Sequence, residues 1–253
     1  MSGHSKWAGI KHHKAAQDSK RGRLFTKIIR ELTISARESG SNPDHNPRLR
    51  KAIEDARTAN MPQDNVKKAI MRGTGELPGV IYEEVSYEGY GPGGVAVLVE
   101  TTTDNKNRTT AEIRKMFSAH GGNLGENGCV GWMFSKKGFI AIDKKTMKED
   151  DFLNLSLEIG ADDVHSDDDD SYEIYTTVED FNKVKKGVDD HKVITLTAEV
   201  TYVPQTYVKL DDKSAEQMLS LMEDLDNHDD VKNVYANFDI AKELMEKISQ
   251  AQG

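Results

Sequence analysis

Cysteine is almost absent from the sequence. Of its 253 residues, only Cys129 carries a thiol. One thiol can neither close a disulfide within the chain nor supply the thiolate set of a structural zinc site. This composition is typical of proteins of the reducing cytosol, so we expect a cytoplasmic protein.

Long apolar runs are absent as well. No stretch approaches the roughly 20 apolar residues that a membrane helix needs, and the start of the chain lacks the apolar core of a secretory signal. We therefore expect no membrane partner. The basic, acid-poor start also has the composition of a mitochondrial transit peptide, which is the alternative interpretation of this end.

Recognisable catalytic and cofactor motifs are missing too. The glycine-rich stretches Tyr90–Gly94 and His120–Gly128 match neither the dinucleotide fingerprint nor the P-loop with its Lys-Ser/Thr pair, so they indicate turns. The spacing of polar residues supports no Ser-His-Asp arrangement and no close carboxylate pair. We predict no catalytic residues, no cofactor and no enzymatic activity.

The histidines and the acidic run do not form a metal motif. His4, His12 and His13 have no further ligand beside them in the sequence. Asp167–Asp170 lacks the alternation and the closing Glu of an EF-hand loop. We predict no metal site, and a solvated acidic turn at the second position.

One polar loop keeps an enzymatic alternative open. Thr102–Arg108 lies between a predicted strand and a predicted helix, where functional sites often occur. Capping of the helix is its other role, and the sequence favours neither. An enzyme with a site at residues 104–108 is therefore the further alternative function, and it would depend on Asn105, Asn107 or Arg108.

The charge of the chain is divided between a basic start and an acidic remainder. Residues 1–75 carry sixteen Lys and Arg against seven Asp and Glu, a formal +9, whereas the remainder carries eighteen against thirty-six, a formal −18. Lys and Arg that neutralise phosphates release condensed counterions, so nucleic acid is the partner that best explains the basic end. The acidic remainder would be repelled by it, so the basic end should face the nucleic acid.

The first twenty residues have no usable apolar period. Trp7 and Ile10 are the only large apolar side chains before Leu24, so this segment cannot bury enough surface to order itself alone. We interpret it as a mobile basic arm that orders on binding. Its single aromatic residue, Trp7, would stack on an exposed base or pack in a groove.

The predicted helix over Arg21–Glu38 has two different faces. At about 100° per residue, its apolar face holds Phe25, Ile28, Ile29, Leu32 and Ala36. The opposite face carries a basic stripe of Lys20, Arg23, Lys27 and Arg30. Like charges at i,i+4 spacing cost stability, so we favour binding over a merely solvated face for this stripe.

Two more helices complete a small helical module. Asn46 as N-cap and Pro47 at the first position begin a helix that runs to about Ala59, and Gln63–Arg72 forms the next. The first turn of the former carries Arg48, Arg50 and Lys51, which the helix macrodipole disfavours. Nucleic-acid binding and packing of their aliphatic stems are the two open interpretations.

After Pro78-Gly79 the pattern alternates between strands and helices, which indicates an α+β arrangement. The organisation that accounts for it is a pair of ferredoxin-like, split-βαβ α+β domains, one inserted in the other. The predicted elements are strands Val80–Gly89 and Val95–Thr103, helix Arg108–His120, strands Val130–Phe134 and Phe139–Asp143, helix 148–160, strand Tyr172–Thr177, helix Val178–Val188, strands Val193–Val203 and Thr206–Leu210, helix Ser214–Leu225, strand Val231–Phe238 and helix Ile240–Ser249.

The predicted domains follow from these elements. They are a basic arm plus helical nucleic-acid-binding domain over residues 1–78, a discontinuous α+β domain over 79–135 and 206–238, an inserted α+β domain over 136–205, and a C-terminal helix over 239–253. The sequence leaves the oligomeric state open, and a monomer is compatible with it.

Several motifs resemble the YebC/PmpR family. They are GHSKWAGIKHHKAAQDSKRGRLFTKIIRE, NPRLRKAI, NMPQDNVKKAI, YEGYGPGGVAVLVETTTDNKNRT and GGNLG, which together cover most of residues 3–134. The resemblance implies three domains, with the third inserted in the second, and a cytoplasmic, non-enzymatic regulator of gene expression. Gly9, His13 and Cys129 depart from the family pattern, and His13 removes one frequent arginine from the arm.

The resemblance implies two possible roles. Some family members resemble DNA-binding transcriptional regulators, whereas others act on the ribosome and help at proline-containing stretches. We therefore expect DNA or ribosomal RNA, and with it the ribosome, as partner. The residues predicted to bind nucleic acid are Lys6, Trp7, Lys11, His12, Lys14, Lys20, Arg21, Arg23, Lys27, Arg30, Arg48, Arg50 and Lys51.

Overall fold

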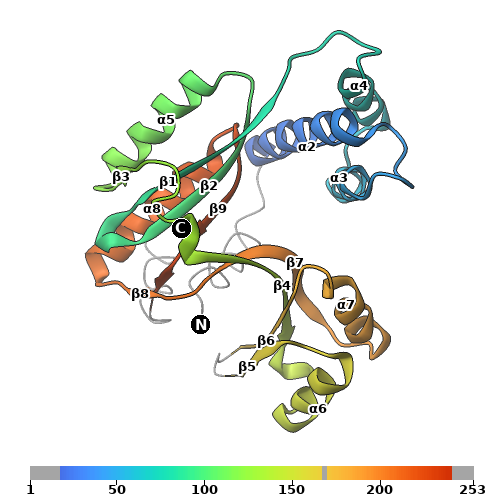
Figure 1. Ribbon diagram of the computed structural model, residues 1–253, viewed down its shortest axis with the longest axis vertical. Helices are drawn as coiled ribbons and strands as arrows, with labels where there is room; N and C mark the ends of the chain where they lie inside the picture. The colour runs from blue at the N-terminus through green and yellow to red at the C-terminus, as the bar shows by residue number, and fades with distance from the viewer. Residues whose placement is uncertain (1–17, 167–169, 241–253) are drawn as a thin grey trace.

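The computed structural model describes residues 18–166 and 170–240, with the side chains of residues 18–20 left out (Figure 1). Within these ranges no helix is both long and apolar enough to cross a membrane. The elements gather into three lobes, each with its own hydrophobic core. The architecture is α+β, as predicted.

The first lobe is purely helical. It contains α2 (Asp18–Ser39), α3 (Pro47–Thr58) and α4 (Gln63–Thr74). Its core confirms the predicted apolar face of α2, since it buries Ile28, Leu32 and Ala36 of α2 together with Leu49, Ala52, Ala56, Met61 and Ala69. Phe25 and Ile29 pack at the edge of this core.

Local signals in the sequence set the ends of these helices. Asn46 caps α3 as predicted: its side chain accepts from the N–H of Leu49 (2.9 Å) and donates to the carbonyls of Ser35 (2.7 Å) and Gly40 (2.9 Å). Gly75 ends α4 in the left-handed conformation, with φ 84°. The capping amide therefore also ties the start of α3 to the end of α2.

The second lobe is a four-stranded antiparallel sheet with helices on one face. It contains β1 (Glu83–Tyr90), the 3-10 turn η1 (Pro92–Gly94), β2 (Ala96–Thr103), α5 (Lys106–Ala119), β3 (Asn123–Leu124), α8 (Asp212–Asn227) and β9 (Val231–Ala236), with strand order β3-β1-β2-β9. Because β2 and β3 both pair antiparallel with β1, β2-α5-β3 is a split βαβ unit. Side chains of α5 and α8 share one core with β2 and β9.

The third lobe is inserted between β3 and α8. It contains β4 (Phe134–Asp143), the 3-10 turn η3 (Lys144–Thr146), α6 (Glu149–Ile159), β5 (Asp163–His165), β6 (Ser171–Thr176), α7 (Phe181–Asp190) and β7 (Thr195–Pro204), in strand order β5-β6-β4-β7. This βαββαβ connection and strand order are ferredoxin-like. The chain then returns through β8 (Val208–Lys209), which pairs with β10 (Phe238–Asp239).

The predicted strand Val130–Phe134 is wrong. Residues Gly131–Met133 form the 3-10 turn η2, and β4 begins at Phe134 and runs without a break into the segment predicted from Phe139. The reason is a contact from far away in the sequence. The Glu88 carboxylate accepts from the N–H groups of Gly128 (2.8 Å), Val130 (2.8 Å) and Gly131 (2.6 Å), so these amides are not available to a sheet.

Other predicted boundaries are shifted. Val80 and Ile81 are exposed and precede β1, α7 begins at Phe181 rather than Val178, and only Val208–Lys209 of the predicted strand Thr206–Leu210 is extended. The short strands β3 and β5 are not predicted, and the predicted strand Val231–Phe238 is divided after Ala236 into β9 and the start of β10. The predicted helix Ile240–Ser249 lies outside the described residues.

The close approach of α2 and α4 yields a prediction about stability. A Cβ on Gly73 would lie 2.9 Å from the Cβ of Ala36 and closer still to the carbonyl oxygen of Thr33, whereas a Cβ on Gly22 would meet nothing within 4 Å. We expect Gly73→Ala to destabilise the helical lobe by roughly 1–3 kcal/mol through overpacking. Gly22→Ala should stabilise it by about 0.5–1 kcal/mol, because alanine is the better helix former.

Hydrogen exchange of the α2 and α4 amides measures both effects within the lobe that carries them. Faster exchange in Gly73→Ala with slower exchange in Gly22→Ala is the expected pair of results. If the two variants shift exchange in the same direction, the two helices do not meet at Gly73 as described.

Candidate nucleic-acid interface

The predicted basic residues of the arm and α2 fall into two groups, those up to Arg23 and those after it. Lys6, Trp7, Lys11, His12 and Lys14 lie outside the described residues, as does the side chain of Lys20. Arg21 is exposed and Arg23 partly exposed, and no carboxylate of the described residues forms an ion pair with either. The start of α2 therefore presents cations that the described part of the protein does not neutralise.

The second group, Lys27 and Arg30, faces the sheet lobe. Lys27 Nζ donates to the backbone carbonyl of Asp226 (2.6 Å), and Arg30 donates to that of Asp229. Arg30 also forms an ion pair with Asp230 at 2.8 Å, and the two side chains are only 12% and 2% exposed. Lys27 and Arg30 thus attach the helical lobe to the end of α8 and to the loop that follows it, a segment that spans residues 226–230.

Asp230 collects donors from several elements. Besides Arg30, its carboxylate accepts from Arg108 (2.7 Å), Thr109 (2.6 Å) and Thr103 (3.1 Å). Burial opposes ionisation of this group, but the Thr109 and Arg108 bonds and the charge of Arg30 outweigh burial and lower the pKa of Asp230. The carboxylate is therefore charged at neutral pH and holds α2, α5 and the 226–230 segment together.

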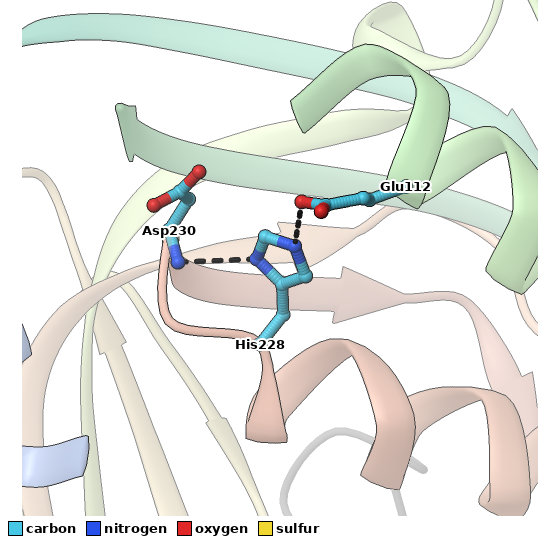
Figure 2. A group of neighbouring side chains, drawn as sticks. All are labelled: Glu112, His228 and Asp230. Atoms are coloured by element: carbon cyan, nitrogen blue, oxygen red, sulfur yellow. Dashed lines mark hydrogen bonds and ion pairs between the residues drawn. The ribbon is translucent and has the colours of Figure 1, made fainter. Parts of the chain in front are cut away.

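Glu112, His228 and Asp230 lie close enough together to suggest a metal site. Their potential ligand atoms lie within 4.8 Å of one another. Figure 2 shows, however, that one ring nitrogen of His228 bonds to the Glu112 carboxylate (2.9 Å) while the other accepts from the backbone N–H of Asp230 (3.1 Å). Both ring nitrogens are occupied and Asp230 is held by two arginines, so this donor set fits a hydrogen-bonded charge network and not a cation.

The 102–108 loop belongs to the same network. The Asn105 side chain accepts from the N–H of Arg108 (3.1 Å) and caps α5. Arg108 pairs with Asp104 (2.8 Å) as well as with Asp230, and its pKa is raised by these bonds. The capping role that the sequence left open is therefore present in the structure.

Arg48 holds three elements together. It pairs with Glu31 (2.7 Å) and Glu38 (2.7 Å) of α2 and with Glu84 (2.5 Å) of β1. Burial opposes ionisation of Glu31, but the hydrogen bonds from Arg48 and Lys232 outweigh it and lower the pKa of Glu31. Arg48 is thus engaged in attaching α3 to the other two elements, despite its unfavourable place in the first turn.

Arg50 and Lys51 differ in how firmly they are held. Arg50 donates to the carbonyls of Pro43 (3.1 Å) and Asp44 (3.0 Å) and so closes the loop before α3. Lys51 pairs only with Asp55 among the described residues (2.7 Å), and its side chain is 72% exposed. A surface pair of this kind contributes little stability, so Lys51 can exchange Asp55 for another anion.

A hollow of about 310 Å³ opens where the three lobes meet. The four cations along it are Arg48 and Lys51 of α3, Lys136 of β4 and Lys232 of β9, and its other charged or polar residues are Glu31, Asp55, Glu100, Tyr202, Asn233 and Tyr235. The Lys136 ammonium lies 5.9 Å from the ring centre of Tyr202 and has no carboxylate partner among the described residues. Lys232 pairs with Glu31 (2.9 Å).

The sequence did not identify Lys136 and Lys232. Lys232 is an isolated lysine on its strand and Lys136 is followed by Lys137, and only the fold brings the two beside Arg48 and Lys51. The adjacent bases Lys136-Lys137 are the one local signal for the first of them. The hollow therefore combines two predicted cations with two that the sequence did not identify.

The Asp230 network yields a prediction about the attachment of the helical lobe. Asp230→Asn keeps the shape of the side chain but removes the charge that Arg30 and Arg108 share. We expect a loss of roughly 1.5–3 kcal/mol, which is typical for hydrogen bonds to a charged group. Because this carboxyl has a lowered pKa, its contribution is complete above its ordinary pKa of about 4 and is lost as the pH falls through the lower folded value.

Urea unfolding across a pH series measures both effects. Asp229→Asn is the matched control, since this neighbouring carboxylate is exposed and its loss should change little. The stability difference between wild type and Asp230→Asn should be largest near neutral pH and should shrink below about pH 4. A difference that persists unchanged in acid would mean that the charge of Asp230 does not hold the lobes together.

Two protein-family models match the sequence. Models of the TACO1/YebC protein N-terminal domain and of the TACO1/YebC second and third domain match residues 5–76 and 82–238. A protein of Endomicrobium trichonymphae is 58% identical over 98% of this chain and 100% of its own length, and one of Dictyoglomus turgidum is 56% identical with the same coverage. Both are named "Probable transcriptional regulatory protein".

A solved structure agrees with these matches. The crystal structure of a conserved hypothetical protein from Aquifex aeolicus superimposes with a TM-score of 0.77 at 46% identity, covering 90% of this chain and 94% of that one. Its fold is therefore shared across most of both chains. Together with the two family models, which span nearly the whole sequence, this similarity shows that the chain belongs to the TACO1/YebC family.

Proposed function

We propose that this protein is a non-enzymatic regulator of gene expression that binds RNA, with ribosomal RNA as the favoured target. The observation that carries the proposal is the placement of the available cations. The basic arm leads into α2, whose Arg21 and Arg23 have no carboxylate partner among the described residues, and Lys51 and Lys136 line the hollow. Phosphate is the ligand that such cations select.

The shape of the hollow favours RNA over a straight duplex. A space of about 310 Å³ between lobes is of the size that accepts small ligands, and it is too small for a double helix. Single-stranded loops and ends of RNA can insert one nucleotide into such a space, since their bases are unstacked. The partly exposed ring of Tyr202 beside the lysines suits that chemistry.

A transcriptional regulator that binds duplex DNA is the second candidate. Its support is the name of the bacterial relatives and one feature of the helical lobe. Helices α3 and α4 are joined by only four residues, Ala59–Pro62, a connection typical of a helix-turn-helix pair. The exposed Lys67 and Lys68 of α4 would then face the DNA.

An enzyme with a site at residues 104–108 is the least supported candidate. Asn105 caps α5, and Arg108 is bound to Asp104 and Asp230. These contacts support a structural role for the loop, and the family relatives are named as regulators. Catalysis at this loop would require function to survive removal of the arm.

Removal of the arm tests the proposal. We expect a variant that starts at Arg21 to bind single-stranded RNA and purified ribosomes more weakly than the intact chain, because it lacks four lysines. For a single strand, the slope of log affinity against log salt becomes shallower by about 0.7 for each phosphate that the protein no longer neutralises. The slope should therefore fall by up to about 3. The same titration with promoter and random duplex DNA separates the two candidates.

The outcomes are distinct. Arm-dependent ribosome binding near physiological salt, with weak DNA binding that does not discriminate between sequences, supports action on the ribosome. Specific duplex binding that requires Lys67 and Lys68 would replace it with the transcriptional candidate. Undiminished binding to RNA and ribosomes without the arm would contradict the proposed role of the arm.

The hollow yields a separate prediction. Lys51→Ala and Lys136→Ala should each weaken RNA binding and lower the salt slope by about 0.7, because each removes one cation that neutralises a phosphate. The control is Lys186→Ala on α7, an exposed lysine that lies away from the hollow. Fluorescence anisotropy with a labelled RNA measures all three, and equal affinities for the two hollow variants and the control would show that RNA does not enter the hollow.

A further inference from the structure

Two aromatic side chains are exposed at the turn η2, which leads into the inserted lobe, and at the end of β1. Trp132, in η2, is 67% exposed, and Tyr90, at the end of β1, is 38% exposed. Single exposed aromatics are common on protein surfaces and need no explanation. These two do require an explanation, because hydrogen bonds to the protein fix the orientation of both rings.

The polar ends of both rings converge on one backbone atom. The Tyr90 hydroxyl donates to the carbonyl oxygen of Cys129 (3.2 Å), and the Trp132 indole N–H donates to the same oxygen (3.3 Å). Each ring therefore has its hydrogen-bonding group satisfied within the protein. What the two side chains still offer to solvent is their aromatic surface.

The segment that carries Trp132 is fixed from both sides. Before it, the Glu88 carboxylate accepts from the N–H groups of Gly128, Val130 and Gly131. After it, the N–H of Gln205 donates to the carbonyl of Met133 (2.9 Å), which links the turn to the strand that returns from the inserted lobe. A partner that binds this surface therefore pays little conformational entropy, because the turn is already fixed.

A cation close to Trp132 in the sequence indicates the chemistry of the partner. Lys136 is the third residue of β4, only four residues after Trp132, and it lines the hollow with no carboxylate partner among the described residues. A partner that combines a flat apolar ring with an anionic backbone meets both features. Single-stranded nucleic acid has this combination, since its bases stack on aromatic side chains while its phosphates contact cations.

We propose that Tyr90 and Trp132 form a stacking site for an unpaired nucleobase, next to a phosphate contact at Lys136. The inference rests on the proposed RNA binding and extends it to a particular surface. The bound strand passes over η2 and enters the hollow, so that one base lies against the aromatic pair outside the hollow. Because every base has an aromatic face, this site tolerates different sequences.

Fluorescence of Trp132 itself tests the inference. The chain has two tryptophans, so in a Trp7→Phe background only Trp132 reports. Titration with a short oligouridylate should quench this emission at the same concentrations at which labelled oligouridylate gains anisotropy. An abasic oligomer of equal length and charge should bind more weakly and leave the emission unchanged.

Variants in the same background complete the test. Trp132→Ala should weaken oligouridylate binding on the order of ten-fold but leave binding of the abasic oligomer unaltered. Trp132→Phe should restore most of the affinity, and Leu157→Ala, which removes an exposed apolar side chain of α6, should have no effect.

The failures can be told apart. If oligouridylate binds with no quenching and Trp132→Ala binds it as well as its parent, the stacking site is wrong while RNA binding stands. The stacking site is also wrong if Trp132→Ala weakens the binding of a protein partner but leaves oligouridylate binding unchanged. If the intact chain binds no RNA at all, the proposed function fails together with the inference.

Discussion

The buried carboxylate of Asp230 is the contact on which the arrangement of the first two lobes depends. It is 2% exposed and binds Arg30 from the helical lobe and Arg108 from the sheet lobe. A carboxylate in such a place is costly unless its partners stay, because removal of one partner leaves a poorly solvated charge. The 226–230 segment, the start of α5 and the middle of α2 therefore hold together as one unit.

Arg48 acts as a second contact of the same kind and determines which cations remain for a ligand. By binding Glu31, Glu38 and Glu84 it attaches α3 to α2 and to the start of β1. With Arg48 engaged in this way, Lys51 one turn further along α3 is carried to the edge of the hollow. A single helix thus carries both kinds of cation: Arg48 and Arg50 are engaged in structural contacts, whereas Lys51 is exposed.

Local patterns are sufficient for the helices, and long-range contacts explain most of what such patterns miss. Asn46-Pro47 and the 3.6-residue period predict α3 to within one residue and α2 to within three, since caps and periodic burial depend on neighbours in the chain. The sequence predicts a strand where η2 lies, because nothing local reveals that these amides bind Glu88, some forty residues earlier. The place of Lys136 and Lys232 at the hollow depends on the fold in the same way, so the sequence did not predict it. Nor did the sequence predict that Lys27 and Arg30 bind the 226–230 segment.

Under the proposed function, the sites where a phosphate can bind depend on which carboxylate it would have to displace. A phosphate at Arg30 would have to displace Asp230 and leave that carboxylate buried without one of its two arginines, which is strongly unfavourable. A phosphate at Lys51 has to displace only Asp55 from an exposed pair, which contributes little. Arg21, Arg23 and Lys136 have no carboxylate to release among the described residues. If the protein binds RNA as proposed, the phosphates would therefore contact the start of α2 and the hollow, and the network around Asp230 would remain intact.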